Sequence, residues 1–425
     1  MVTTYGCWVS PLTRFVGLRR AQRSVISNYR RVWANAKPLL IFQGDFAYLG
    51  GQVMDESKED KSHYLRYQTP LPPSSGLVEL LHSTWTVRVV KCAVELGVID
   101  ALDAGPAQSD VVADRLGLDR RGTAYLLDSL TAAGLLSRAE LNGRVRSIRP
   151  VYELSEMARV YLTSASPLFM GLYLEQHHHL DKMWQRLGDS LKSGKPVMQV
   201  EKKEDAEAIF PRLAEAIIPW NFSIASDLVK SLQKLEKGSS DFVGPHRRIL
   251  DVGAGSAVWS IPFAQADAAV TVWAQDLTGV LDVARKMAQK CHCSEQMRYL
   301  PGDWRDVLPD LADREGFYDI AILGHILHAE GLVSSRDLLR KIAALTRSGG
   351  LLIIGEFMPN NERTAPQFAV DFALNMYLAT SQGCVFSFAE ISQLCIEAGF
   401  SRVFRHNAID ALPYDSPVVI AVRDD

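Results

Sequence analysis

The stretch Arg248-Ile-Leu-Asp-Val-Gly-Ala-Gly-Ser256 decides the fold class. It is typical of a buried apolar strand that runs into a turn of small residues, and a helix is expected from about Val258. Gly253 and Gly255 leave room for a ligand against the backbone, and Asp276, at the end of the next expected strand, can accept both hydroxyls of a ribose. This combination indicates a cofactor that contains a nucleoside.

A dinucleotide-binding turn is one alternative for this segment. It would need a third glycine at position 258, where helix and strand pack closely, and Val258 stands there. An ordinary tight turn is the other alternative, because a pair of glycines also serves purely conformational needs. The order of the elements that follow therefore decides the interpretation.

Four more strands are expected at 270–274, 297–300, 318–323 and 350–354, each separated from the next by a segment of helical length. This alternation predicts an α/β fold with a parallel sheet and a ligand at its carboxyl edge. Two further strands, at about 401–408 and 417–422, are joined by a short loop and are expected to form a terminal hairpin.

With these motifs in this order, residues 78–425 resemble the class I S-adenosylmethionine-dependent methyltransferases, whose Rossmann-like, seven-stranded sheet ends in such a hairpin. The resemblance implies S-adenosylmethionine as the cofactor. It also implies a set of cofactor-binding residues: Asp251, Gly253 and Gly255 around the amino-acid part, Asp276 at the ribose, Leu277 on the adenine, and Gly302, Asp303 and Trp304 as a second adenine contact, with Asp303 toward the exocyclic amine.

The bulk composition describes an ordinary globular protein. The net charge of −3 argues against a polyanion-binding role, so we expect no nucleic-acid partner. No run of about eighteen apolar residues occurs, so no membrane span is expected. Six scattered cysteines fit a reducing compartment and predict a cytoplasmic location.

The first fifty-odd residues differ from the rest, since seven basic residues precede the first acid, Asp45. An organelle transit peptide has this composition, and so has an extension upstream of a start at Met54. We expect residues 1–77 to be a basic, poorly ordered extension and linker without a catalytic part.

Residues 78–165 contain the pattern of a winged helix. Helices are expected at 84–104, 109–118 and 120–136, followed by short strands near 136–138 and 144–152 with Asn142-Gly143 as a turn. A DNA-binding regulator is the rival interpretation, but the third helix lacks the cationic and amide side chains that read a groove. In O-methyltransferases of the plant phenolic, hydroxyindole and bacterial natural-product kind, which this segment resembles, such a unit forms a homodimer.

Residues 166–240 are expected to be helices that connect this domain to a catalytic domain at 241–425. By resemblance, one of these helices passes over the cofactor cleft, and it makes Phe210, Trp220 and Asn221 candidates for the pocket wall. Core packing is the competing explanation for the two aromatic residues.

Methyl transfer from a sulfonium to a hydroxyl needs alignment and a base that removes the proton. A histidine suits that role, because its ordinary pKa of about 6.5 leaves it neutral near pH 7. The segment Ile326-Leu-His-Ala-Glu330 resembles the family pattern Leu-His-Asp-Trp, so His328 matches the base and Glu356 the residue that orients it. His325 is expected to pack or to contact the cofactor, and Glu330 is the candidate to replace the missing aspartate.

An apolar helix at 368–379 is expected over the cleft, and Met376, Tyr377 and Ser381 correspond to pocket-lining positions. They imply a flat, mainly apolar acceptor with a hydroxyl on a phenolic, polycyclic or other natural-product ring. No acidic cluster of the catechol type is present in the sequence, so metal independence is predicted. Methylation of carbon or nitrogen, and a non-catalytic ligand sensor, are the alternatives.

Overall fold

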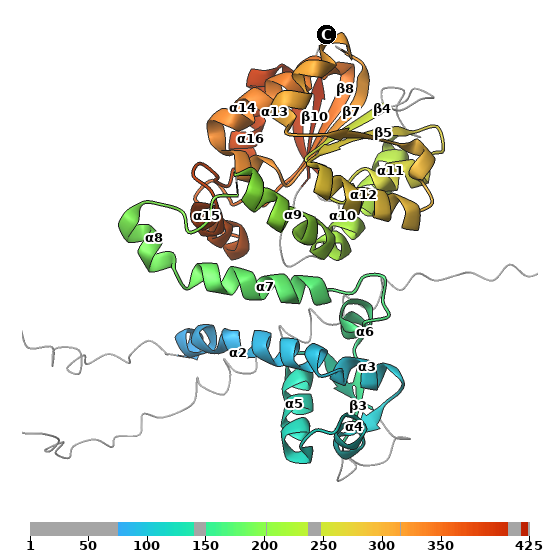
Figure 1. Ribbon diagram of the computed structural model, residues 1–425, viewed down its shortest axis with the longest axis vertical. Coiled ribbons are helices and arrows are strands. Elements are labelled where there is room, and N and C mark those ends of the chain that lie inside the picture. Colours follow the sequence, from blue (N-terminus) through green and yellow to red (C-terminus); the bar gives the residue numbers. More distant parts are fainter. Residues whose placement is uncertain are drawn as a thin grey trace, which may run out of the picture. The chain divides into compact units, whose positions relative to one another are not determined.

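The computed structural model describes residues 75–139, 150–200, 202–236, 248–314, 316–406 and 418–423. Their largest element is a seven-stranded sheet in the order β6-β5-β4-β7-β8-β10-β9 (Figure 1). β10 is antiparallel to both of its neighbours, and the other pairs are parallel. The strands are β4 (Arg248–Val252), β5 (Thr271–Asp276), β6 (Met297–Pro301), β7 (Tyr318–Gly324), β8 (Thr346–Gly355), β9 (Phe400–His406) and β10 (Val418–Arg423).

The central strand is apolar because both of its faces are covered. Along β4, Ile249 belongs to the core on one face of the sheet, and Leu250 belongs to the core on the other. Helices α10 (Ile218–Glu236), α11 (Ile261–Ala266) and α12 (Thr278–Lys290) cover the first face. Helices α13 (Trp304–Val307), α14 (Leu327–Leu345) and α16 (Phe388–Ala398) cover the second. The predicted fold class and the terminal hairpin are confirmed.

The helix after β4 begins later than the sequence predicts. α11 starts at Ile261 rather than near Val258, and residues 255–260 form turns. Gly255 and Ala257 have left-handed φ angles of 59° and 58°, which a helix cannot include, and Pro262 stands in the first turn of α11.

The amino-terminal helices enclose a core of their own. The segment predicted as one helix over 84–104 is two helices, α2 (Ser75–Glu95) and α3 (Val98–Asp103), with left-handed Gly97 between them. The elements that follow are β1 (Ala107–Gln108), α4 (Ser109–Leu116), α5 (Arg120–Ala132), β2 (Leu136–Arg138), β3 (Val151–Leu154) and α6 (Glu156–Leu162). The three strands form an antiparallel sheet, β1-β3-β2. The turn expected at Asn142-Gly143 lies outside the described residues.

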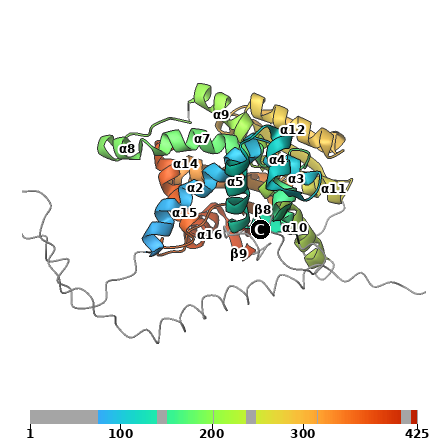
Figure 2. The same cartoon turned by 90° about the horizontal axis from the view of Figure 1, so that it is seen from below.

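Further helices connect this unit to the sheet: α7 (Gly171–Trp184), α8 (Leu187–Ser193) and α9 (Lys203–Ala216). α9 packs against both α7 and α12 (Figure 1, Figure 2). The expected apolar helix is α15 (Gln367–Ala379), and Trp184 of α7 donates its indole N–H to Asn375 of α15 at 3.0 Å. Among the described helices, none is both long and apolar enough to cross a membrane.

Candidate active site

The turn after β4 requires glycine at its first bend. Gly253 has a φ of +64°, and a Cβ there would lie 2.8 Å from Cδ1 of Ile326. Gly255 has a φ of +59°, and its nearest neighbour is Ala214 of α9. The turn therefore lies between the start of α14 and the helix α9.

Asp276 holds this turn in place from the end of β5. One oxygen of its carboxylate accepts a hydrogen bond from the backbone N–H of Gly255 at 2.8 Å, and the other accepts from Leu277 at 2.7 Å. Burial raises the pKa of Asp276 to about 6, although both hydrogen bonds act in the opposite direction. The acid predicted at the ribose thus lies directly beside the glycine turn.

Asp251 is fully buried behind the same turn. Its Oδ2 accepts a hydrogen bond from Ser260 at 2.5 Å, whereas its Oδ1 has no partner among the described residues. Burial raises the pKa of Asp251 to about 7. A buried carboxyl with an unpartnered oxygen is costly to desolvate, which is consistent with its raised pKa.

Two of the three residues predicted as the second adenine contact are bound to other side chains of the protein. Asp303 caps α13 and pairs with the guanidinium of Arg305 at 3.1 Å. Trp304 is buried in the core, and its indole N–H donates to Glu330 at 3.0 Å. Gly302 adopts a φ of +134° directly after β6, and its backbone N–H donates to the carbonyl of Asp276 at 3.0 Å.

Gln275 is a buried polar residue between the two turns that sequence reasoning missed. Its amide donates to the carbonyl of Gly302 at 2.5 Å, and its Oε1 lies 3.5 Å from the N–H of Gly253. Gln275 thereby joins the turn after β4, at Gly253, to the turn after β6, at Gly302. A polar residue in an otherwise buried strand, directly before the predicted ribose acid, was the available signal.

His328 and Glu356 meet at the carboxyl edge of the sheet. Because β7 and β8 are parallel neighbours, the residues that follow them lie side by side. Nδ1 of His328 lies 2.8 Å from Oε2 of Glu356, and the backbone N–H of His328 donates to Oε1 at 3.2 Å. A carboxylate only accepts hydrogen bonds, so the ring proton sits on Nδ1 and Nε2 carries the lone pair.

The electrostatics of this pair keep the acid ionised. Burial alone would raise the pKa of Glu356, but the charge and hydrogen bonds of His328 outweigh burial and lower it below the usual value. An ionised carboxylate beside an imidazole stabilises the ring once it has taken up a second proton.

Three phenylalanine rings form an apolar wall around His328. The ring of Phe372 lies edge-on at 5.0 Å, and Phe357 lies 4.7 Å from Phe372 and 5.0 Å from Phe368. Phe368 and Phe372 are spaced four residues apart on α15, so one face of that helix carries both. This spacing was the sequence signal for the two rings, which were not among the predicted pocket residues.

The predicted pocket residues are distributed over several places. Trp220 lies 6.1 Å from Phe357, ring to ring, and belongs to the aromatic wall. Met376 is buried in α15, and Phe210 is half-buried in α9. The hydroxyl of Tyr377 donates to the carbonyl of Ser190, which ties α15 to α8. Ser381 is exposed beyond the end of α15.

Asn221 contacts His325 rather than His328. Its Oδ1 lies 3.1 Å from Nε2 of His325, the residue that follows β7. Glu330, the candidate replacement for the family aspartate, binds Trp304, Arg305 and Ser334 and takes no part in the pair of His328 with Glu356.

Within the described part of the chain, His325, His328 and Glu356 form a group whose potential ligand atoms lie within 4.8 Å of one another, as a metal site would require. The hydrogen bond between His328 and Glu356 explains why two of these three residues lie close together. The predicted metal independence remains a prediction.

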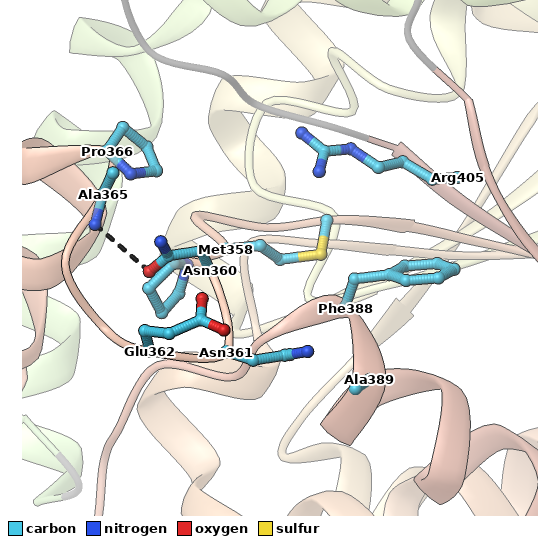
Figure 3. Close-up of a pocket in the computed structure, with 10 residues that line it drawn as sticks. Met358, Asn360, Asn361, Glu362, Ala365, Pro366, Phe388, Ala389 and Arg405 are labelled. Atoms are coloured by element: carbon cyan, nitrogen blue, oxygen red, sulfur yellow. Dashed lines mark hydrogen bonds between the residues drawn. The ribbon is translucent and has the colours of Figure 1, made fainter.

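A separate pocket of about 490 Å³ lies along the loop that follows β8 (Figure 3). Figure 3 shows Asn360 turned toward Ala365, whose N–H it binds at 3.2 Å, with Phe388 and Arg405 on the other side. None of the predicted site residues lines this pocket.

Two family models match the chain, one over the amino-terminal helices and one over most of the seven-stranded sheet. A model described as the O-methyltransferase dimerisation domain matches residues 78–164, and one described as the O-methyltransferase domain matches residues 231–401. The chain belongs to the S-adenosylmethionine-dependent O-methyltransferase family. It is an O-methyltransferase that uses S-adenosylmethionine as its methyl donor.

Curated relatives of this O-methyltransferase act on aromatic compounds. A 3-hydroxy-5-methyl-1-naphthoate 3-O-methyltransferase from Streptomyces sahachiroi is 26% identical over 333 residues, which are 77% of this chain and 89% of the relative. Acetylserotonin O-methyltransferase from Mus musculus is 27% identical over 340 residues, which are 77% of this chain and 84% of the relative.

Solved structures show the same fold. A putative O-methyltransferase from Nostoc punctiforme superposes with a TM-score of 0.69 at 22% identity, covering 83% of this chain and all of the other. Human N-acetylserotonin methyltransferase, in complex with S-adenosylmethionine, gives a TM-score of 0.64 at 21% identity, covering 88% of this chain and all of the other.

Proposed function

We propose that this O-methyltransferase methylates a hydroxyl group on a small aromatic or natural-product acceptor, with His328 as the general base and Glu356 as its positioning residue. The observation that carries the proposal is the 2.8 Å hydrogen bond between Nδ1 of His328 and Glu356 inside a wall of phenylalanine rings. An apolar wall favours a flat, apolar acceptor, and the base supplies the polar function that a hydroxyl needs.

The turn after β4, beside this pair, suits S-adenosylmethionine. This turn leaves no room for a side chain at Gly253, and the carboxylate of Asp276, the proposed ribose contact, lies beside it. Buried polar atoms without a partner in the described structure gather here, among them Oδ1 of Asp251 and Oγ of Ser256. Asp251, Gly253, Gly255 and Asp276, with Leu277, Gly302, Asp303 and Trp304 on the adenine side, form the proposed cofactor set.

The proposed reaction is an in-line displacement. When bound, S-adenosylmethionine supplies a methyl group that its positive sulfur activates. Nε2 of His328 accepts the proton of the acceptor hydroxyl as the oxygen–carbon bond forms, and the carbon–sulfur electron pair stays with sulfur. Glu356 stabilises the imidazolium that results.

The aromatic wall and the relatives together support the acceptor class. The wall brings together the rings of Phe357, Phe372 and Trp220, and two relatives are named as O-methyltransferases of a naphthoate and of acetylserotonin. The acceptor is therefore proposed to be a hydroxylated bicyclic or larger aromatic ring. A cytoplasmic location and a homodimer complete the proposal.

The test is transfer of a labelled methyl group to a panel of hydroxylated naphthalenes and indoles, each paired with its amino analogue. We expect label on oxygen in at least one hydroxylated member of the panel. A relative described as N,N-dimethyltransferase OxyT from Streptomyces rimosus is 25% identical over 372 residues, 84% of this chain and 99% of the relative. Label exclusively on nitrogen would reject the hydroxyl acceptor in favour of that activity.

A further inference from the structure

His325 has an unusual backbone conformation beside the cofactor turn. Its φ of +62° is left-handed, and its N–H donates to the carbonyl of Gly355 at 2.8 Å, which fixes the bend. Residues other than glycine that are held in this region cluster at ligand sites. The imidazole lies 5.8 Å from the ring of Trp259 and 4.5 Å from the ring of Phe357.

The contact with Asn221 fixes the proton on this ring. Because Oδ1 of Asn221 only accepts, Nε2 of His325 carries the hydrogen and Nδ1 carries the lone pair. Burial lowers the pKa of His325 to about 4; the charge of Glu356 opposes this shift and that of His328 adds to it. The ring is therefore neutral near pH 7, and Nδ1 is a hydrogen-bond acceptor.

Two polar atoms of this pair are buried without a partner among the described residues. They are Nδ1 of His325 and Nδ2 of Asn221, whose side chain is 1% exposed. The first only accepts a hydrogen bond, and the second only donates. Unpaired buried groups are costly and rare in folded proteins, so this pair indicates a ligand that supplies both a donor and an acceptor.

The amino-acid end of S-adenosylmethionine carries both complements, an ammonium group and a carboxylate. The pair lies on the correct side, because β7 is the neighbour of β4 and Ile326, the residue after His325, contacts Gly253 of the turn. We propose that His325 and Asn221 bind this amino-acid end, with Nδ1 accepting from the ammonium and Nδ2 donating to the carboxylate. This places Asn221 at the cofactor rather than in the acceptor pocket expected from the sequence.

This inference rests on the cofactor of the proposed function and not on its base or acceptor. Calorimetry on the full chain therefore compares two ligands, S-adenosylhomocysteine and 5′-methylthioadenosine, which lacks the amino-acid part. We expect His325→Phe and Asn221→Leu each to weaken S-adenosylhomocysteine about 10- to 100-fold, as loss of a hydrogen bond to a charged group does, and to change methylthioadenosine by less than about twofold.

Asp276→Ala is the matched control, because a ribose contact should weaken both ligands alike. Equal weakening of both ligands by the His325 and Asn221 variants would mean that these residues merely support the turn, and would overturn the proposal. So would unchanged binding of S-adenosylhomocysteine, or a wild-type protein that binds both ligands equally. Failure of His328 as the base would leave all of these affinities unaffected.

Discussion

Glu356 orients the ring of His328, the proposed base. By accepting from Nδ1, it leaves Nε2 of His328 as the proton acceptor. We predict that Glu356→Gln lowers kcat by roughly 10²–10⁴, because an amide can also hold the wrong tautomer of the ring. Steady-state kinetics would show this with little change in the affinity for S-adenosylhomocysteine. A loss confined to KM would instead make Glu356 a structural residue.

The buried Asp251 makes stability depend on pH. Its folded pKa of about 7 lies above the ordinary value of 3.8, so the carboxyl is favourable while protonated, below about pH 4, and the benefit is lost as the pH rises through 7. Asp251→Asn cannot ionise, and we predict that it gains up to about 4 kcal/mol over the wild type between pH 4 and pH 8. Melting curves without cofactor test this, and parallel curves for the two proteins would contradict it.

Residues at strand ends were the most predictable part of the site. His328, Glu356 and Asp276 each follow a recognisable strand, and neighbouring parallel strands bring such positions together. The contact between Asn221 and His325 was not predictable, because it joins positions 104 residues apart through the packing of a helix on a strand end. The contacts of Asp303 with Arg305 and of Trp304 with Glu330 were likewise not predictable from the sequence.

The ends of β7 and β8 pack closely against the indole ring of Trp259, which follows the turn after β4. A Cβ on Gly324 would lie 2.4 Å from Trp259, and a Cβ on Gly355 would lie 2.5 Å from the same ring. This packing explains why glycine stands at both strand ends. The start of α11 was mispredicted for a related reason, since the chain turns through Ala257 to bring Trp259 beneath the strands.

We predict that Gly355→Ala destabilises the fold by about 1–3 kcal/mol, the usual cost of overpacking. Gly188→Ala in α8 is the control, because a Cβ there meets nothing within 4 Å and alanine favours a helix. Denaturant unfolding would measure both variants. Equal stability of the two would show that Trp259 can move aside at no cost.

For the whole molecule, α2 presents a large exposed apolar surface. Leu77, Leu81 and Trp85 are each about 60% exposed and recur every four residues on one helix face. Large exposed apolar patches mark interfaces, and this helix belongs to the matched dimerisation domain. The winged-helix pattern made this domain predictable, whereas the break of its first helix at Gly97 depended on a local left-handed turn.

We predict that the double variant Leu81→Glu, Trp85→Glu is a monomer under conditions where the wild type is a dimer. Sedimentation would distinguish the two states. Val111→Glu, at an exposed apolar position of α4, is the control and should remain dimeric. A dimeric double variant would place the interface elsewhere.

In the proposed reaction, His328 removes the proton from the acceptor hydroxyl. The most direct measurement compares His328→Gln with the wild type on 2-naphthol and on a nitro-substituted naphthol that is already ionised at the assay pH. We predict that the variant transfers methyl to 2-naphthol roughly 10²–10⁴-fold more slowly, and that the deficit shrinks to about tenfold or less on the ionised acceptor, which needs no base. Equal deficits on both acceptors would rule out His328 as the base and leave it with a purely structural role.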